Sequence, residues 1–193
     1  MITAICPTYN ESNYIEKVLK FFINAIPKDK ELFIIDGGSN DGTKEIVNKW
    51  AEKYSNVHLL DNPNKFVPFA LNIGISKSKG DPIIRLDAHT EYEDDYFIQI
   101  INTFEKSGSD IVGGPMRAIG KTAFQRAVAY CTSTSFGIGG SKIHQPEYEG
   151  ESDHVYLGAW QRKLFKDVGL FDERLKRNQD DEFHYRARSL GKR

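Results

Sequence analysis

Residues 32–42 read LFIIDGGSNDG, an unbroken apolar run that ends in an aspartate and a glycine-rich turn. An apolar run without alternation predicts a strand that is buried on both faces of its sheet. Residues 2–6 form a similar run that Pro7 closes, and residues 57–60 and 83–86 repeat the pattern. Segments with helical spacing of apolar residues separate these runs. The sequence therefore predicts an α/β fold with a mainly parallel central sheet flanked by helices.

The alternation of strands and helices continues to about residue 115 and then stops. Helical spacing is seen at residues 15–26, 46–54, 66–77 and 97–104, with a fifth strand expected at 110–112. Residues 133–151 are rich in Gly, Ser and Thr and show no period, which is typical of a functional or mobile loop. The sequence becomes regular in its pattern of apolar residues again at residues 159–168, and a last helix is expected at residues 180–190.

The composition restricts the classes of protein to which the chain can belong. It has 193 residues, with 26 Lys+Arg against 27 Asp+Glu and a formal net charge of -1. This balance argues against a nucleic-acid binder, which carries a strong basic excess. Two cysteines form no disulfide framework, which favours a reducing, cytoplasmic setting. The sequence contains no apolar run of about 18 residues, the length that a membrane-spanning helix needs.

Polar residues that could carry chemistry follow three of the predicted strands. In an open parallel sheet, ligands bind beyond the carboxyl ends of the strands. Residues 7–11, PTYNE, follow the first strand, Asp36 and Gly37 end the second, and Asp87 and His89 end the fourth. We therefore expect these residues to meet at one edge of the sheet.

Each of these side chains has a structural and a functional interpretation. The Asp36 carboxylate could accept a hydrogen bond from a ligand N–H while Gly37 permits close approach, or Asp36 could serve only the turn. Tyr9 could stack on a base or pack beneath its loop. Asp87 and His89 are potential metal ligands: a carboxylate with an imidazole suits Mn²⁺, and a carboxylate with phosphate oxygens suits Mg²⁺.

The last helix and the residues before it leave similar alternatives open. Asp180 and Asp181 lie in a first helical turn, where carboxylates are favoured, but adjacent carboxylates also raise each other's pKa and suit a general base. Arg186 lies further along this helix, where it could orient a carboxylate, meet a phosphate or contact the acceptor. Trp160 is either a core residue or a platform on which a sugar stacks.

Six segments occur in an order that resembles family 2 glycosyltransferases of the GT-A fold, the fold of nucleotide-diphospho-sugar transferases with a Rossmann-like sheet. The Asp-Ala-His and Asn-Gln-Asp-Asp-Glu-Phe segments look most like the branch that builds bacterial exopolysaccharides of the succinoglycan type. The similarity extends over essentially the whole chain. The segments are residues 6–11 (CPTYNE), 36–43 (DGGSNDGT), 70–74 (ALNIG), 87–89 (DAH), 169–173 (GLFDE) and 178–186 (NQDDEFHYR).

The resemblance implies an inverting transfer of a sugar from a nucleotide diphosphate, usually UDP, to an acceptor hydroxyl in polysaccharide or glycolipid synthesis. By position, Tyr9 and Asp36 would hold the uracil, and Gly37 would lie beside them. The residues that would shape the rest of the nucleotide pocket are Pro7, Thr8 and Glu11.

The resemblance also implies a divalent cation, Mn²⁺ or Mg²⁺, and a catalytic base. Asp87 resembles the first residue of the family's Asp-x-Asp motif and would contact ribose and metal. His89 stands where the second aspartate usually binds the cation, which is a departure from the family pattern. Asp180 aligns with the family's base, and Asp181 is the alternative.

The same resemblance implies how the chain is organised and what it meets. The single domain 1–193 would divide into a nucleotide-binding half, 1–115, and an acceptor-binding half, 116–193, with substrate choice set by residues 133–153 and those near Trp160. Its partners would be a nucleotide-sugar and a saccharide or lipid-linked acceptor. We expect a fragment of a longer cytoplasmic protein that reaches the inner face of the membrane only through other segments. The alternatives are a nucleotidyltransferase and a nucleotide-sugar binding module without turnover.

Overall fold

A six-stranded sheet forms the centre of the fold, in the order β3-β2-β1-β4-β6-β5. The computed structural model describes residues 1–134, 137, 142–145 and 148–193. Strands β1 to β4 pair in parallel, whereas β6 is antiparallel to both β4 and β5. The strands are β1 (Ile2–Thr8), β2 (Lys30–Asp36), β3 (Val57–Asp61), β4 (Ile83–Arg85), β5 (Ile111–Gly114) and β6 (Tyr156–Trp160).

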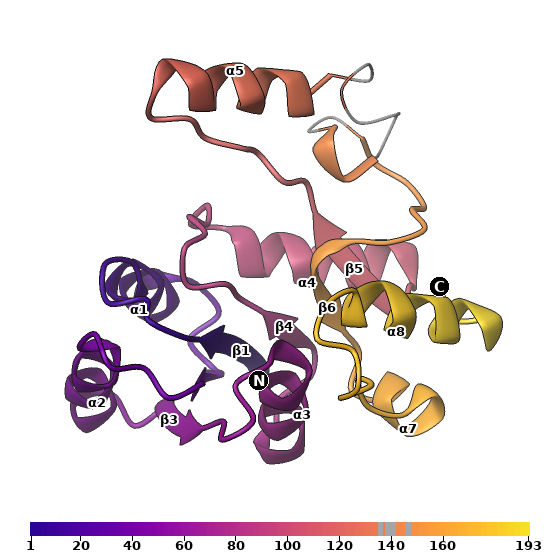
Figure 1. The fold of residues 1–193 in the computed structure, drawn as a ribbon. Helices are drawn as coiled ribbons and strands as arrows, with labels where there is room; N and C mark the ends of the chain where they lie inside the picture. The colour runs from indigo at the N-terminus through magenta and orange to yellow at the C-terminus, as the bar shows by residue number, and fades with distance from the viewer. Residues whose placement is uncertain (135–136, 138–141, 146–147) are drawn as a thin grey trace.

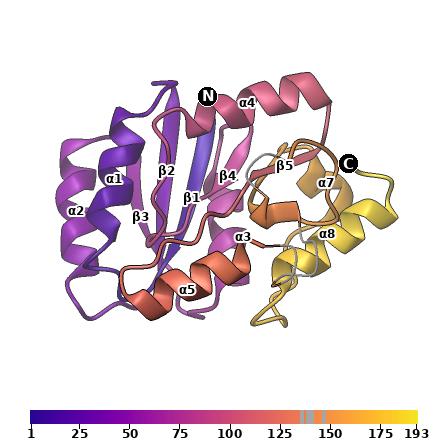
Figure 2. The ribbon, with the colours of Figure 1, turned by 90° about the horizontal axis from the view of Figure 1, so that it is seen from above.

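Helices cover both faces of this sheet, as the unbroken apolar strands predict (Figure 1). Apolar residues of α1, α2 and α4 pack on one face, and those of α3, α7 and α8 pack on the other. Figure 2 shows the strands enclosed between these helices. The helices are α1 (Ile15–Asn24), α2 (Thr43–Lys53), α3 (Val67–Lys77), α4 (Tyr96–Ser107), α5 (Ala123–Thr132), the short 3-10 helix η1 (Lys142–His144), α7 (Leu164–Val168) and α8 (Gln179–Ser189).

The strand β6 is the element that the sequence pattern did not indicate. It inserts between β4 and β5, so that Ala159 pairs with both Ile84 and Val112. Its side chains serve both faces, because Ala159 joins the core beneath α4 and Trp160 joins the core beneath α8. The insertion ties the C-terminal third of the chain to the parallel strands of its first half.

The helix α5 stands apart from the rest of the fold, at the top of Figure 1. None of its residues is buried. Its exposed large apolar side chains include Phe124, Val128 and Tyr130. Its N-terminus is closed by a capping box between Thr122 and Gln125. Among the described residues, no helix is both long enough and apolar enough to cross a membrane.

Replacing Gly80 by alanine is expected to destabilise the fold by about 2 kcal/mol, because the site has no room for a side chain. An added Cβ would lie 2.5 Å from the carbonyl carbon of Ile2 and 2.7 Å from the backbone nitrogen of Thr3. The Gly80 N–H also donates to Thr3 Oγ1 and to Glu31 Oε1. Urea unfolding measures the change. Gly114→Ala is the control, since its Cβ would meet Tyr96 at 3.8 Å; an equal loss in both variants would contradict the packing argument.

Candidate functional site

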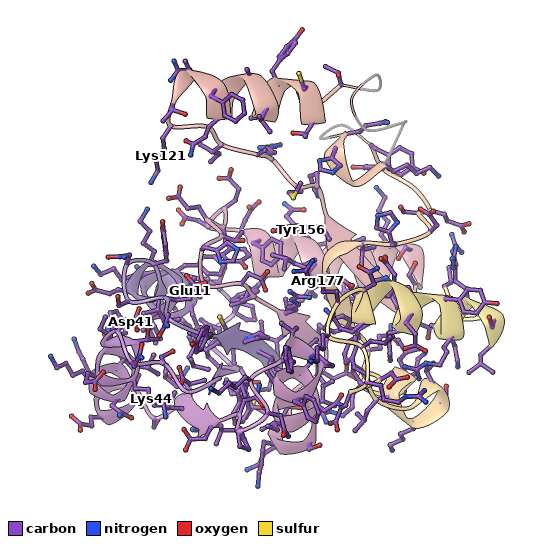
Figure 3. The ribbon with its side chains drawn as sticks, viewed as in Figure 1. Glu11, Asp41, Lys44, Lys121, Tyr156 and Arg177 are labelled. Atoms are coloured by element: carbon purple, nitrogen blue, oxygen red, sulfur yellow. The ribbon has the colours of Figure 1, made fainter. Side chains whose placement is uncertain are left out.

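A cleft of about 280 Å³ opens at the carboxyl ends of β1 and β4. Six of the predicted site residues line it together, although they come from two separate loops. Figure 3 shows Glu11 at this edge of the sheet. The six residues are Pro7, Thr8, Tyr9, Glu11, Asp87 and His89.

The β1–α1 loop presents Tyr9 to solvent and holds the rest of its backbone in place. The Tyr9 side chain is 53% exposed, so its ring can receive a planar ligand. The Glu11 N–H donates to Thr43 Oγ1, and the Ser12 N–H donates to Asp41 Oδ2. Asp41 itself accepts from the Thr43 hydroxyl, which with its other hydrogen bonds holds the pKa of the Asp41 carboxyl well below its usual range. This wall of the cleft is therefore fixed to the start of α2.

The turn after β2 lies behind the cleft. The Asp36 side chain is buried and accepts hydrogen bonds from the backbone N–H groups of Gly38 and Ser39 and from the Ser39 hydroxyl. The structure therefore shows Asp36 serving the turn and does not place it in the cleft lining. Gly37 donates its N–H to the carbonyl of Thr8, and a Cβ at Gly37 would lie 3.3 Å from the carbonyl oxygen of Lys65. The glycine thus permits the close approach of the Lys65 loop, which lines the cleft.

Asp87 is held at both its side chain and its backbone. Arg85 Nε lies 3.0 Å from Asp87 Oδ1, and Arg85 Nη2 lies 3.2 Å from Asp87 Oδ2. The Asp87 N–H donates to the Tyr92 hydroxyl at 2.7 Å, and that hydroxyl donates to the Asp87 carbonyl at 3.3 Å. Burial raises the pKa of Tyr92, so the phenol keeps the proton that it donates. The carboxylate therefore has a fixed position at the mouth of β4.

Arg85 is a site residue that sequence reasoning missed. It lies in the cleft lining with a side chain that is 14% exposed. A signal was present, because an arginine inside the apolar run 83–86 precedes Asp87 by two residues, and such residues lie on one face of a strand. Lys65 also lines the cleft and was missed, since it lies in a loop for which no pattern predicts direction. Its backbone has a φ of 68°, a conformation that side-chain-bearing residues seldom adopt.

Two protein side chains are available to bind a divalent cation. His89 Nδ1 lies 3.0 Å from Glu11 Oε1, which orients the ring, and the imidazole is largely exposed. Asp87 offers its carboxylate two residues earlier. Within the described ranges, no cluster of three or more His, Cys, Asp or Glu side chains could hold a metal. The chemistry of this pair fits a cation that brings most of its ligands with it as phosphate oxygens and water.

The two adjacent aspartates at the start of α8 differ in their surroundings. Asp180 Oδ2 lies 3.9 Å from Arg85 Nη1, and the Asp180 side chain is 39% exposed. Asp181 is exposed, and its N–H donates to Asp180 Oδ1. Of these two aspartates, only Asp180 forms an ion pair with Arg85 among the described residues. The geometry thus places Asp180 across Arg85 from Asp87.

Trp160 and Arg186, which we considered as acceptor residues, are both held by contacts within the protein. Trp160 is 1% exposed and packs against Phe171 and Phe183, so its ring faces cannot receive a sugar. The Arg186 guanidinium bonds to Glu182 and to the carbonyls of Val168 and Leu170. These contacts join α8 to the end of α7 and leave Arg186 away from the cleft. The acceptor interpretation was wrong for Trp160, for which the core alternative holds. Arg186 orients the Glu182 carboxylate, and its contact with an acceptor stays a prediction.

The fold, the cleft and its two carboxylates can now be set against known proteins. Residues 3–169 match the family described as Glycosyl transferase family 2. The chain belongs to this family. That match covers the sheet from Thr3 onward and the whole cleft lining, and it ends at residue 169, before α8 begins. The predicted membership in family 2 is confirmed.

Curated relatives of this family 2 chain act in the synthesis of glycans, by their names. It is 33% identical over 192 residues to the succinoglycan biosynthesis protein ExoA of Rhizobium meliloti (strain 1021), which covers 98% of the chain and 58% of that protein. It is 30% identical over 193 residues to a dolichyl N-acetyl-alpha-D-glucosaminyl phosphate 3-beta-D-2,3-diacetamido-2,3-dideoxy-beta-D-glucuronosyltransferase of Methanococcus voltae, covering 95% and 60%. The chain spans about three-fifths of these relatives' length.

Solved structures share the fold of the family 2 chain. TarS 1-349 of S. aureus, in complex with UDP, superposes with a TM-score of 0.72 at 20% identity, covering 95% of the chain and 53% of that structure. The mannosyltransferase PcManGT from Pyrobaculum calidifontis, in complex with GDP-Man and Mn²⁺, superposes with a TM-score of 0.71 at 21% identity, covering 100% and 53%. The predicted GT-A fold is therefore confirmed.

Proposed function

We propose that this chain is the catalytic part of an inverting glycosyltransferase that takes a sugar from a UDP-sugar and transfers it to an acceptor hydroxyl in polysaccharide or glycolipid synthesis. The observation that carries the proposal is the pair Asp87 and Asp180, which both contact Arg85; Arg85 and Asp87 line the cleft at the strand ends. One carboxylate lies on the donor side of this arrangement and the other comes from the C-terminal third of the chain.

The nucleotide would occupy the cleft beside the β1–α1 loop. Tyr9 is exposed enough to stack on the uracil, while Pro7, Thr8 and Glu11 form the wall beneath it. Asp36 and Gly37 would support the base from behind the lining, because the turn that they form abuts Thr8 and Lys65. A neighbour of the same fold is described as a complex with UDP, which is consistent with a uridine nucleotide as the ligand.

A divalent cation, Mn²⁺ or Mg²⁺, would be held by Asp87 and His89. It would supply positive charge to the leaving diphosphate, which lowers the barrier to breaking the bond to the sugar. The mannosyltransferase neighbour is described as a complex with Mn²⁺. The Tyr92 hydroxyl holds the backbone of Asp87 in place for this role.

Asp180 would act as the general base and Asp181 is the alternative. The base removes the proton from the acceptor hydroxyl, which then attacks the anomeric carbon from the face opposite the diphosphate. Asp180 is better placed, because it is the carboxylate that faces Arg85. The names of the relatives favour a saccharide or lipid-linked acceptor. We assign its choice to residues 133–153, of which 135–136, 138–141 and 146–147 lie outside the described residues.

The proposal is tested with a panel of UDP-sugars in the presence of Mn²⁺ or of Mg²⁺. The release of UDP is measured. Release of UDP from one sugar, dependent on acceptor and cation, is the expected result. Binding of UDP without turnover of any UDP-sugar would instead favour a binding module without activity. A nucleotidyltransferase would form a nucleotide-sugar from a sugar phosphate and a nucleoside triphosphate, so those substrates complete the panel.

Replacing Asp87 by asparagine is expected to weaken cation-dependent UDP binding by about tenfold, because a charged ligand of the cation is lost. Calorimetry with Mn²⁺ present measures the affinity. Asp61→Asn is a matched control. Asp61 ends strand β3 and pairs with Lys44 at the surface, outside the cleft lining. Equal UDP affinity for the Asp87 variant and the native protein would remove Asp87 from the site.

A further inference from the structure

The Arg85 guanidinium lies between two carboxylates that are far apart in the sequence. Its Nε and Nη2 contact both oxygens of Asp87, and its Nη1 lies 3.9 Å from Asp180 Oδ2. The side chain is largely buried, so it depends on these partners more than a surface arginine does. Arg85 therefore connects the end of β4 to the start of α8 through its ion pairs with Asp87 and Asp180.

The contacts of Arg85 conflict with a cation at Asp87. Both carboxylate oxygens of Asp87 already face the guanidinium. A divalent cation bound to the same oxygens would stand close to this positive group, and the two would repel strongly in a partly buried site. One of the two positive charges must therefore withdraw from Asp87 when the other binds.

We propose that Arg85 is an exchangeable internal counter-ion: it holds Asp87 in the donor-free protein, gives up that carboxylate to the arriving cation, and then pairs with Asp180. The proposal rests on the proposed function, because it takes Asp87 as a cation ligand and Asp180 as the base. Arg85 is a positioning residue in this scheme.

Asp180 is the partner that the geometry offers to the released guanidinium. A buried arginine that loses one carboxylate needs another, and Asp180 Oδ2 is already at the limit of ion-pair distance from Nη1. A closer pair would fix the Asp180 side chain, which is otherwise partly exposed and, among the described residues, accepts a hydrogen bond only from the Asp181 N–H. Donor binding would in this way position the base before the acceptor reacts.

Binding of Mn²⁺ alone to the nucleotide-free protein tests the exchange without any turnover, by electron paramagnetic resonance of the free ion. Arg85→Gln removes the competing charge, so Mn²⁺ should bind about tenfold more tightly than to the native protein. Arg85→Lys keeps the charge and should stay within about twofold. Arg174→Gln is the matched control, because Arg174 forms a similar pair two residues from Asp172 at the surface. Unchanged or weaker Mn²⁺ binding in Arg85→Gln would overturn the proposal.

Steady-state kinetics supply the second readout, on the step after exchange. Arg85→Lys cannot form the planar fork that reaches both carboxylates, so we expect kcat to fall by about tenfold while the donor KM changes by less than about twofold. A rise in KM with kcat unchanged would contradict the pairing with Asp180. If the native protein neither binds UDP with Mn²⁺ nor releases it from a UDP-sugar, the proposed function fails; if it does both and Arg85→Gln binds Mn²⁺ no more tightly, the exchange alone fails.

Discussion

Asp180→Asn should lower kcat for sugar transfer by about a thousandfold, the loss typical of removing a general base. The asparagine side chain has nearly the same shape, so α8 should remain folded while the proton acceptor disappears. UDP affinity measured with Mn²⁺ should change by less than about twofold, because Asp180 is separated by Arg85 from Asp87, the proposed cation ligand. Initial rates with a UDP-sugar and calorimetry with UDP give the two quantities.

Asp181→Asn is the matched control for this variant, since it makes the same substitution one residue further along. The Asp181 side chain is exposed, and its contact with Asp180 is made by the backbone N–H, which the substitution retains. We therefore expect Asp181→Asn to keep kcat within about threefold of the native value. Loss of transfer in the Asp181 variant with normal rates in the Asp180 variant would move the role of base to Asp181.

Acid should destabilise the protein through His184, by up to about 3 kcal/mol between pH 7 and pH 4. Burial lowers the pKa of His184 from 6.5 to about 4. Between pH 6.5 and about 4, this imidazole is protonated in the unfolded chain but stays neutral in the folded protein. The free energy of unfolding therefore falls as the pH falls toward 4. The charged and titratable groups near the ring are Asp180, Asp181, His154 and Arg188.

His184→Leu should remove this pH dependence and raise stability at pH 5. Both ring nitrogens of His184 are buried and have no hydrogen-bond partner among the described residues, so an apolar side chain gives up no bond with them. Urea unfolding at several pH values between 7.5 and 4.5 measures the slope. His144→Leu is the control, since His144 is only half-buried and lies in η1. Identical slopes for the native protein and the His184 variant would show that this imidazole takes no part.

The parallel half of the fold is predictable because its strands are buried on both faces. Residues 32–36 and 2–6 read as continuous apolar runs, and the structure pairs them as β2 and β1 over their whole length. The strand β6 escapes this reasoning because Tyr156–Trp160 is five residues long and includes Gly158. Its position between β4 and β5 is set by tertiary pairing, which no local pattern in the sequence expresses.

The sequence predicted which strand ends carry the candidate site, but it did not predict the contacts of each side chain there. Asp87, His89 and the 7–11 segment meet in the cleft because parallel strands end at one edge. The partners of each side chain do not follow from that rule. The sequence does not show that Asp36 is saturated by its own turn, that Arg186 bonds to Val168 and Leu170, or that Arg85 spans two carboxylates.

The insertion of β6 also has a consequence for the order in which the chain can fold. As residues 1–115 leave the ribosome, β3, β2, β1 and β4 can pair, but β5 has no neighbour until residues 156–160 have been made. During that interval the free edge of β4 exposes unpaired backbone groups, which invite contact with other chains. Closure of the sheet then joins strands some 75 residues apart, a slow step by loop-closure entropy. The last strand to be synthesised, among those that the structure describes, is the one that joins β5 to the rest of the sheet.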